Sequence, residues 1–216
     1  MKLGRYIYIF SIAVILIAAK WGGYPFLIAP DPSTVGRPES IKPAHETRSG
    51  IDDFSDHLFI KILKHLHCSR IFIPRSELSI IISAVMESSE RYGFDPELIF
   101  SLIQKESSFK SSAVSTKGAI GLMQVLPSTA QFLSRELEIE YSGEETLLDP
   151  VANIEIGTYY LYKLLHDFKD LDTALSAYNI GPSKTTEIKG SAPTLKTDFS
   201  LGVQVDQAKL SLQAYR

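Results

Sequence analysis

Apolar residues recur at intervals of three and four in one segment after another, which is the spacing of the buried face of a helix. The helix from residue 76 to 92, for example, is expected to bury Ile80, Ile81, Ala84 and Val85. No run of alternating apolar and polar residues indicates a strand, so the sequence predicts an all-α fold. Start and stop signals place the predicted helices at 54–68, 76–92, 95–107, 128–137, from Asp149-Pro150 onward, 172–179 and 203–215.

Length and charge limit the classes of protein that this chain can belong to. It has 216 residues, of which 44% are apolar, and a formal net charge of −3. This is enough for one globular domain with a substantial core, and it leaves room for an additional segment. The slightly acidic balance argues against a nucleic-acid partner. Cys68 is the single cysteine, so an intramolecular disulfide is excluded.

The N-terminus resembles an export signal. Lys2 and Arg5 precede an apolar run that extends from Tyr6 to Ala19. That run is shorter than the roughly 20 residues of a spanning helix and fits the core of a signal peptide. If Lys20 reaches the interface, the apolar stretch continues to Ala29 and could remain as a membrane anchor. Residues 1–29 are therefore predicted to be a signal peptide or an anchor, with the rest of the chain in the periplasm or cell envelope.

The next segment has the composition of a flexible linker. Residues 30–53 are rich in Pro, Gly, Ser and charged side chains. Residues 54–216 then form the predicted helical domain.

Glu106 occupies an unusual position in the helix predicted at 95–107. It lies four residues after Leu102 and three after Ile103, so it continues the apolar face of that helix. Carboxylates are seldom buried, and an apolar surrounding raises the pKa of a carboxyl group. Such a group can act as a general acid near neutral pH. The alternative is a glutamate at a frayed helix end, paired with Lys105 or Lys110.

Two separate blocks of the sequence resemble the lytic transglycosylase domain of bacterial cell-wall enzymes, a relative of goose-type lysozyme. The matching core covers residues 75–183 and implies a lysozyme-like fold. The first block contains Glu106-Ser107, Phe109, Ala113, Ser115, Gly118-Ala119, Gly121-Leu122-Met123-Gln124, Pro127 and Thr129-Ala130. The second contains Leu148-Asp149-Pro150, Asn153-Ile154, Gly157, Leu161, Leu164-Leu165, Ala174-Leu175, Ala177-Tyr178-Asn179 and Gly181-Pro182.

The resemblance implies a reaction at the β-1,4 bond between N-acetylmuramic acid (MurNAc) and N-acetylglucosamine (GlcNAc) in peptidoglycan. In that reaction Glu106 acts first as acid and then as base, without metal or cofactor. The 6-hydroxyl of the muramyl sugar attacks the anomeric carbon and leaves a 1,6-anhydro end. The residues themselves agree, because no Asp or Glu lies between Ser107 and Arg135. Asp149 is available, but its place before Pro150 is explained by a helix cap.

The same resemblance assigns roles to residues around Glu106. The two serines would orient Glu106 or contact the N-acetyl group, and the Met-Gln pair would line the groove. The tyrosine would lie near the reacting sugar and the neighbouring asparagine on the polymer. Gly118 and Gly121 indicate a close approach of the backbone. The assigned substrate-binding residues are Ser107, Ser115, Met123, Gln124, Tyr178 and Asn179.

Other functions are also compatible with the sequence. A lysozyme-type muramidase would use the same fold and deliver water in place of the 6-hydroxyl. A non-catalytic wall-binding component of an envelope machine is a further alternative, although Glu106 is intact. His65 and His67 are two residues apart and point to different helix faces, so no metal site is predicted. The expected partners are glycan strands and, if residues 1–29 are retained, the inner membrane.

Overall fold

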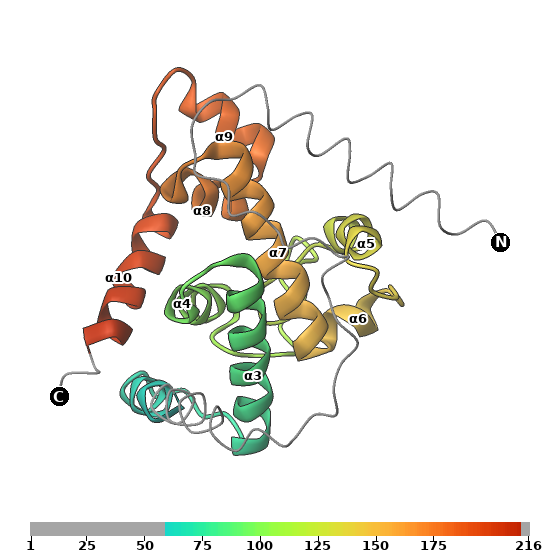
Figure 1. The fold of residues 1–216 in the computed structure, drawn as a ribbon, viewed down its shortest axis with the longest axis vertical. Coiled ribbons are helices and arrows are strands. Elements are labelled where there is room, and N and C mark those ends of the chain that lie inside the picture. Colours follow the sequence, from blue (N-terminus) through green and yellow to red (C-terminus); the bar gives the residue numbers. More distant parts are fainter. Residues whose placement is uncertain (1–58, 213–216) are drawn as a thin grey trace, which may run out of the picture. The chain divides into compact units, whose positions relative to one another are not determined.

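The computed structural model describes residues 59–212. The predicted signal or anchor segment and the linker at 30–53 lie outside the described residues. Residues 59–68 are helical, and eight labelled helices follow (Figure 1). Their bounds are α3 Arg75–Tyr92, α4 Pro96–Ser107, α5 Pro127–Glu136, α6 Glu144–Leu148, α7 Pro150–Phe168, α8 Leu171–Ile180, α9 Pro182–Lys189 and α10 Asp198–Leu212.

The all-α prediction is confirmed for the described residues, in which the only β-type pairing is two isolated bridges, Val114 to Ile120 and Ile120 to Val125. Of the helices in 59–212, none is both long and apolar enough to cross a bilayer. Each predicted helix has a counterpart among the described residues, although the start predicted at 54 and the end predicted at 215 lie outside them. The last helix begins at Asp198, five residues earlier than predicted. Two short helices, α6 and α9, were not predicted.

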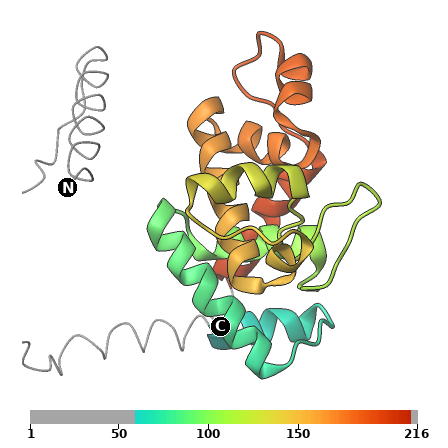
Figure 2. The same cartoon turned by 90° about the vertical axis from the view of Figure 1, so that its right-hand side faces the viewer.

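Helix α7 runs between α3 and α8 (Figures 1 and 2) and packs against both. Helix α4 packs against α3 on one side and α10 on another. The apolar stripes of these helices are buried, with Ile81 and Val85 of α3 and Leu161 of α7 fully covered. Ile80, which was expected to be buried, is 47% exposed.

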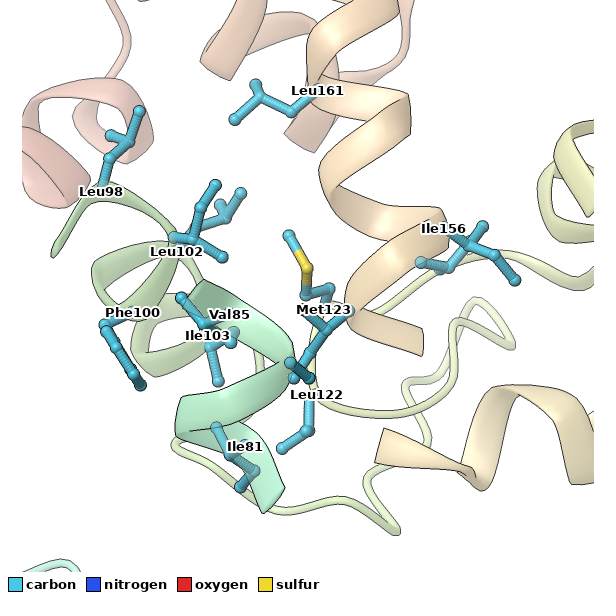
Figure 3. Packing of buried hydrophobic residues seen from close by; sticks show 14 of the residues in the cluster. Ile81, Val85, Leu98, Phe100, Leu102, Ile103, Leu122, Met123, Ile156 and Leu161 are labelled. Atoms are coloured by element: carbon cyan, nitrogen blue, oxygen red, sulfur yellow. The ribbon is translucent and has the colours of Figure 1, made fainter. Parts of the chain in front are cut away.

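The loop between α4 and α5 contributes to the same core. Leu122 and Met123 are fully buried and insert between α4 and α7 (Figure 3). The loop is therefore anchored in the core by these two side chains, although it has no regular secondary structure.

Candidate active site

Glu106 is held in place by a sharp turn at the end of α4. Asp95 caps the start of that helix by accepting a hydrogen bond from the backbone N–H of Glu97. At the other end Ser108 and Phe109 both have positive φ, at 50° and 63°. This conformation is uncommon for residues other than glycine. The Phe109 ring is buried against Phe100, with centroids 6.3 Å apart, and this contact fixes the turn.

The carboxyl group of Glu106 lies in an apolar setting. Its neighbours on the helix face, Leu102 and Ile103, are fully buried, and Glu106 itself is half-buried. Burial raises the pKa of Glu106 from 4.5 to about 7. Within residues 59–212 no cation forms an ion pair with it. Lys105 instead extends over Gly202 of α10.

Glu106 opens onto a pocket of about 330 Å³ whose walls come from four separate parts of the sequence. These parts are the end of α4, the loop that follows it with the start of α5, the middle of α7, and the end of α8. Glu106 is the only carboxyl group in the described lining, and Lys117 is its only cation. The lining residues are Glu106, Ser115, Lys117, Ala119, Gln124, Val125, Leu126, Thr129, Tyr160, Tyr178, Asn179, Ile180 and Gly181.

Tyr178 forms the wall beside Glu106. Its hydroxyl donates a 2.8 Å hydrogen bond to the backbone oxygen of Met123, and its ring packs on Tyr160 at 5.2 Å. Burial and the nearby Glu106 raise the pKa of Tyr178 well above its ordinary value. The hydroxyl therefore keeps its proton, and the ring is fixed from two sides.

Ser115 and Gln124 line the pocket and also brace its loop. The Ser115 hydroxyl accepts a 3.0 Å hydrogen bond from the backbone N–H of Ala119. The amide nitrogen of Gln124 donates to the carbonyls of Ala113 and Gly121 at 3.0 and 2.9 Å. With the amide nitrogen engaged in this way, the amide oxygen is the atom of Gln124 left to meet a ligand.

Two of the assigned substrate-binding residues do not line the pocket. Ser107 is buried and donates its hydroxyl hydrogen bond to the carbonyl of Ile103, at 3.2 Å. Met123 is fully buried, with its sulfur accepting from the Thr158 hydroxyl at 3.7 Å. Met123 supports the wall in another way, because its backbone oxygen accepts the hydrogen bond of Tyr178. Ser115, Gln124, Tyr178 and Asn179 lie with Glu106 around the same space.

Asn153 was not assigned to the site, although it controls the loop. It is completely buried in α7, and its side-chain oxygen accepts from the Met123 N–H at 2.8 Å. Its nitrogen donates to the carbonyls of Ile120 and Leu147, both at 2.9 Å. A Cβ on Gly121 would lie 2.3 Å from that nitrogen, so the loop can approach only through a glycine. A polar residue on the apolar face of a helix is the sequence feature that could have identified it, as it did for Glu106.

The remaining candidates lie away from the pocket. The Asp149 carboxylate accepts from the backbone N–H of Ala152 at 2.8 Å, as expected for the cap of α7, and is not part of the lining. His65 is buried and contacts the side chain of Gln104. No group of three side chains suited to a metal ion is found in the described part of the chain.

Helices packed around a pocket with one half-buried glutamate define a lysozyme-like helical domain. The family model described as Transglycosylase SLT domain matches residues 83–199, which is more than half of the chain. The chain belongs to this family, as the two sequence blocks predicted. The family match continues past residue 183, where the sequence resemblance ended, and reaches the start of α10.

Curated relatives and a solved structure agree with this assignment. The membrane-bound lytic murein transglycosylase C of Mannheimia succiniciproducens is 36% identical over 110 residues, which cover 46% of this chain and 31% of that protein. The protein of the same name from Edwardsiella ictaluri is 35% identical over 136 residues, covering 56% of this chain and 38% of that one. The chain thus spans about a third of the length of these relatives.

A comparison with solved structures points to the same family. The X-ray structure of an inactive glutamate-to-glutamine mutant of the lytic transglycosylase Slt from Pseudomonas aeruginosa superimposes with a TM-score of 0.55. The two chains are 26% identical, and the match covers 62% of this chain and 24% of the other. The lysozyme-like fold class is therefore confirmed.

Proposed function

We propose that this protein is a peptidoglycan lytic transglycosylase that cleaves the β-1,4 bond between MurNAc and GlcNAc and leaves 1,6-anhydro-muramyl ends. The observation that carries the proposal is Glu106, a single carboxyl group in its pocket with a pKa raised to about 7 by burial. The family match and the names of the curated relatives support the same activity.

In the first half of the reaction Glu106 acts as an acid. It transfers its proton to the oxygen of the leaving sugar while the bond between that oxygen and the anomeric carbon of MurNAc breaks. With a pKa of about 7, half of the molecules carry this proton at neutral pH. At the ordinary pKa of 4.5 only about one molecule in three hundred would carry it.

In the second half the same group acts as a base. The 6-hydroxyl of the muramyl sugar forms a bond to its own anomeric carbon and gives its proton to the Glu106 carboxylate. This restores the acid and consumes no water. The attack is intramolecular, so its rate gains from proximity. The new end is lighter by one water than the product of hydrolysis.

The alternative enzyme is a muramidase that delivers water to the same carbon. Glycosidases that use water generally place a second carboxylate beside the scissile bond. The described pocket lining contains none, and Asp149 is engaged as a helix cap. This observation favours the transglycosylase over the hydrolase.

The test is a digest of purified peptidoglycan with the full chain, followed by mass spectrometry of the new sugar ends. We expect 1,6-anhydro-muramyl ends as the main product. Glu106→Gln should lower the rate at least about 100-fold, because the amide cannot donate the proton. Asp149→Asn, which keeps the cap, should cleave like the wild type. Reducing ends as the main product would instead establish the muramidase, and full activity of Glu106→Gln would remove Glu106 from the mechanism.

We further propose that the domain acts in the cell envelope, on glycan strands in the periplasm. The export-like N-terminus supports this location, and the curated relatives are named membrane-bound.

A further inference from the structure

Lys117 is the one cation in the described lining of the pocket, and the mechanism does not use it. It lies in the tight turn that begins at Ser115 and ends at Gly118, closed by a 2.9 Å hydrogen bond from the Gly118 N–H to the Ser115 carbonyl. Gly118 has a φ of 79°, which the turn requires and which glycine adopts without strain.

The backbone of the turn around Lys117 is held by hydrogen bonds, although the Lys117 side chain is exposed. The backbone N–H of Ser115 donates to the carbonyl of Ala119 at 2.9 Å, and the Ser115 hydroxyl accepts from the N–H of Ala119. Val114 and Ile120 pair across the same turn. The turn is thus closed by three hydrogen bonds, which fix the backbone from which the Lys117 side chain reaches the pocket lining.

The electrostatic setting of Lys117 favours an anionic ligand. Within residues 59–212 no carboxylate lies at ion-pair distance from it. Glu106 is the only acid in the described pocket lining, and burial raises its pKa to about 7, so much of it is neutral at neutral pH. The pocket therefore offers a positive charge that the protein itself does not fully compensate.

We propose that Lys117 forms a subsite for a carboxylate of the glycan substrate, and that it makes the pocket selective for muramyl glycan over uncharged glycan. This inference rests on the proposed function. MurNAc differs from GlcNAc by an O-linked lactyl group. Its carboxyl group is either free or joined to a peptide stem that carries carboxylates of its own. Both sources present the same anion to an ammonium group, with a charge-assisted hydrogen bond as the contact.

The test combines a change in the protein with a matched change in the substrate. Lys117→Met removes the charge, Lys117→Arg keeps it, and Lys110→Met removes an equal charge from an exposed lysine outside the pocket lining. The substrates are glycan strands with peptide stems and strands stripped to the free lactyl carboxylate. Each is used as it is and with its carboxylates converted to methylamides.

We expect neutralising the substrate to lower the kcat/KM of the wild type about tenfold, mainly through KM, which corresponds to about 1.4 kcal/mol. On the charged strand, the kcat/KM of Lys117→Met should already be as low as that of the wild type on the neutralised strand. Neutralising the strand should then lower the kcat/KM of Lys117→Met little further. Lys117→Arg and Lys110→Met should respond to substrate charge as the wild type does. The wild-type preference should shrink in high salt, because the contact is partly exposed.

The two carboxylate sources separate in this experiment. Loss of the preference in Lys117→Met on stripped strands assigns the subsite to the lactyl carboxylate. A loss confined to strands with stems assigns it to the peptide. Equal responses of the wild type and Lys117→Met to substrate neutralisation, on both kinds of strand, would overturn the proposal.

A binding measurement keeps this inference separate from the proposed reaction. Dissociation constants of the same four strands are measured with Glu106→Gln, alone and combined with Lys117→Met. If the products of the wild type prove to be reducing ends, the proposed reaction fails while the charge preference in binding still stands. If the products are anhydro ends and neither binding nor kcat/KM depends on Lys117, the subsite fails alone.

Discussion

At the scale of single residues, the most informative choice in this chain is a glutamate where a leucine would pack. Glu106 continues the stripe of Leu102 and Ile103, and its carboxyl group is neutral in half of the molecules at neutral pH. The sequence alone predicted both the burial of Glu106 and the upward shift of its pKa. The absence of an ion pair with Lys105, whose side chain lies over α10, could not be predicted, because the packing of α10 was unknown.

The raised pKa of Glu106 predicts a pH-dependent loss of stability. The folded protein holds this proton up to about pH 7, whereas the unfolded chain releases it near 4.5. Stability therefore falls as the pH rises through this window. Glu106→Gln lacks this dependence. The difference in free energy of unfolding between Glu106→Gln and the wild type should therefore shift by about 3 kcal/mol in favour of the variant as the pH rises from 4 to 8.

Urea unfolding of both proteins across that range measures the difference. Because all other groups are shared, their contributions cancel in the comparison. A difference between the two proteins that stays constant from pH 4 to 8 would show that Glu106 has an ordinary pKa.

At the scale of elements, the site depends on how one irregular loop is attached to α7. The sequence indicated close backbone approach at Gly118 and Gly121. Gly121 does lie against Asn153, and Gly118 instead meets open space in a turn with positive φ. The partner in the close approach could not be read from the sequence, because the loop and α7 are separated by α5 and α6.

We expect Asn153→Ala to destabilise the protein strongly. It would leave the N–H of Met123 and the carbonyl of Leu147 without the hydrogen bonds that Asn153 gives them in a buried position, whereas the carbonyl of Ile120 still accepts from the N–H of Val125. One unsatisfied group costs about 1–3 kcal/mol, so two of them predict a loss of at least about 2 kcal/mol. Val151→Ala, at an exposed position of the same helix, should change stability by less than about 1 kcal/mol. Similar urea midpoints for the two variants would contradict this role of Asn153.

Gly157→Ala tests how closely α7 supports the pocket wall. An added Cβ would lie 2.7 Å from the Met123 side chain and 3.0 Å from the Tyr178 hydroxyl oxygen. Alanine favours a helix by about 1 kcal/mol over glycine, but overpacking a core costs about 1–3 kcal/mol. We expect no net stabilisation and a fall in kcat of about tenfold, because the tyrosine is displaced.

Gly202→Ala is the matched control for this variant. Its Cβ would meet Lys105 Nζ at 2.8 Å, and the flexible end of an exposed lysine can move away. Stability should stay equal or rise, and kcat should not change. If both glycine variants behave alike in kcat, the pocket wall does not depend on the contact of α7 with Tyr178.

The helices missed by sequence analysis lack the feature on which the prediction relied. Helix α9 buries only Thr185 and therefore shows no apolar stripe. Pro182 follows soon after the helix predicted at 172–179 and occupies the first turn of a new helix, where a missing N–H costs nothing. Helix α6 has five residues, too few for a recognisable period.

At the scale of the whole molecule, helical periodicity predicted the all-α class and the family resemblance implied the lysozyme-like fold, whereas the lining of the pocket was predicted only in part. Lys117 and Tyr160 line the pocket, and neither was predicted as a site residue. They belong to the loop and to α7, whose relative position depends on packing and not on local pattern. The two separated motif blocks identified Ser115, Gln124, Tyr178 and Asn179, which the structure brings together with Glu106.

Export is the prediction that concerns the entire chain. A reporter that is active only outside the cytoplasm, fused after residue 52, should be active in cells. The basic residues Lys2 and Arg5 should stay in the cytoplasm and direct the apolar run across the membrane. The same fusion without residues 1–29 should be inactive. Activity that survives this deletion would show that the N-terminal segment is not the export signal.

The proton on Glu106 also determines which synthetic ligands the pocket selects. A ligand with a permanent positive charge against this carboxyl group binds the ionised form alone. Below about pH 7 the group must first release its proton. The affinity of this ligand therefore increases with rising pH, by up to tenfold per pH unit, and levels off above about pH 7. A neutral ligand that accepts a hydrogen bond from the acid shows the opposite trend. Ligand affinity as a function of pH thus reports the charge state of Glu106 without any turnover.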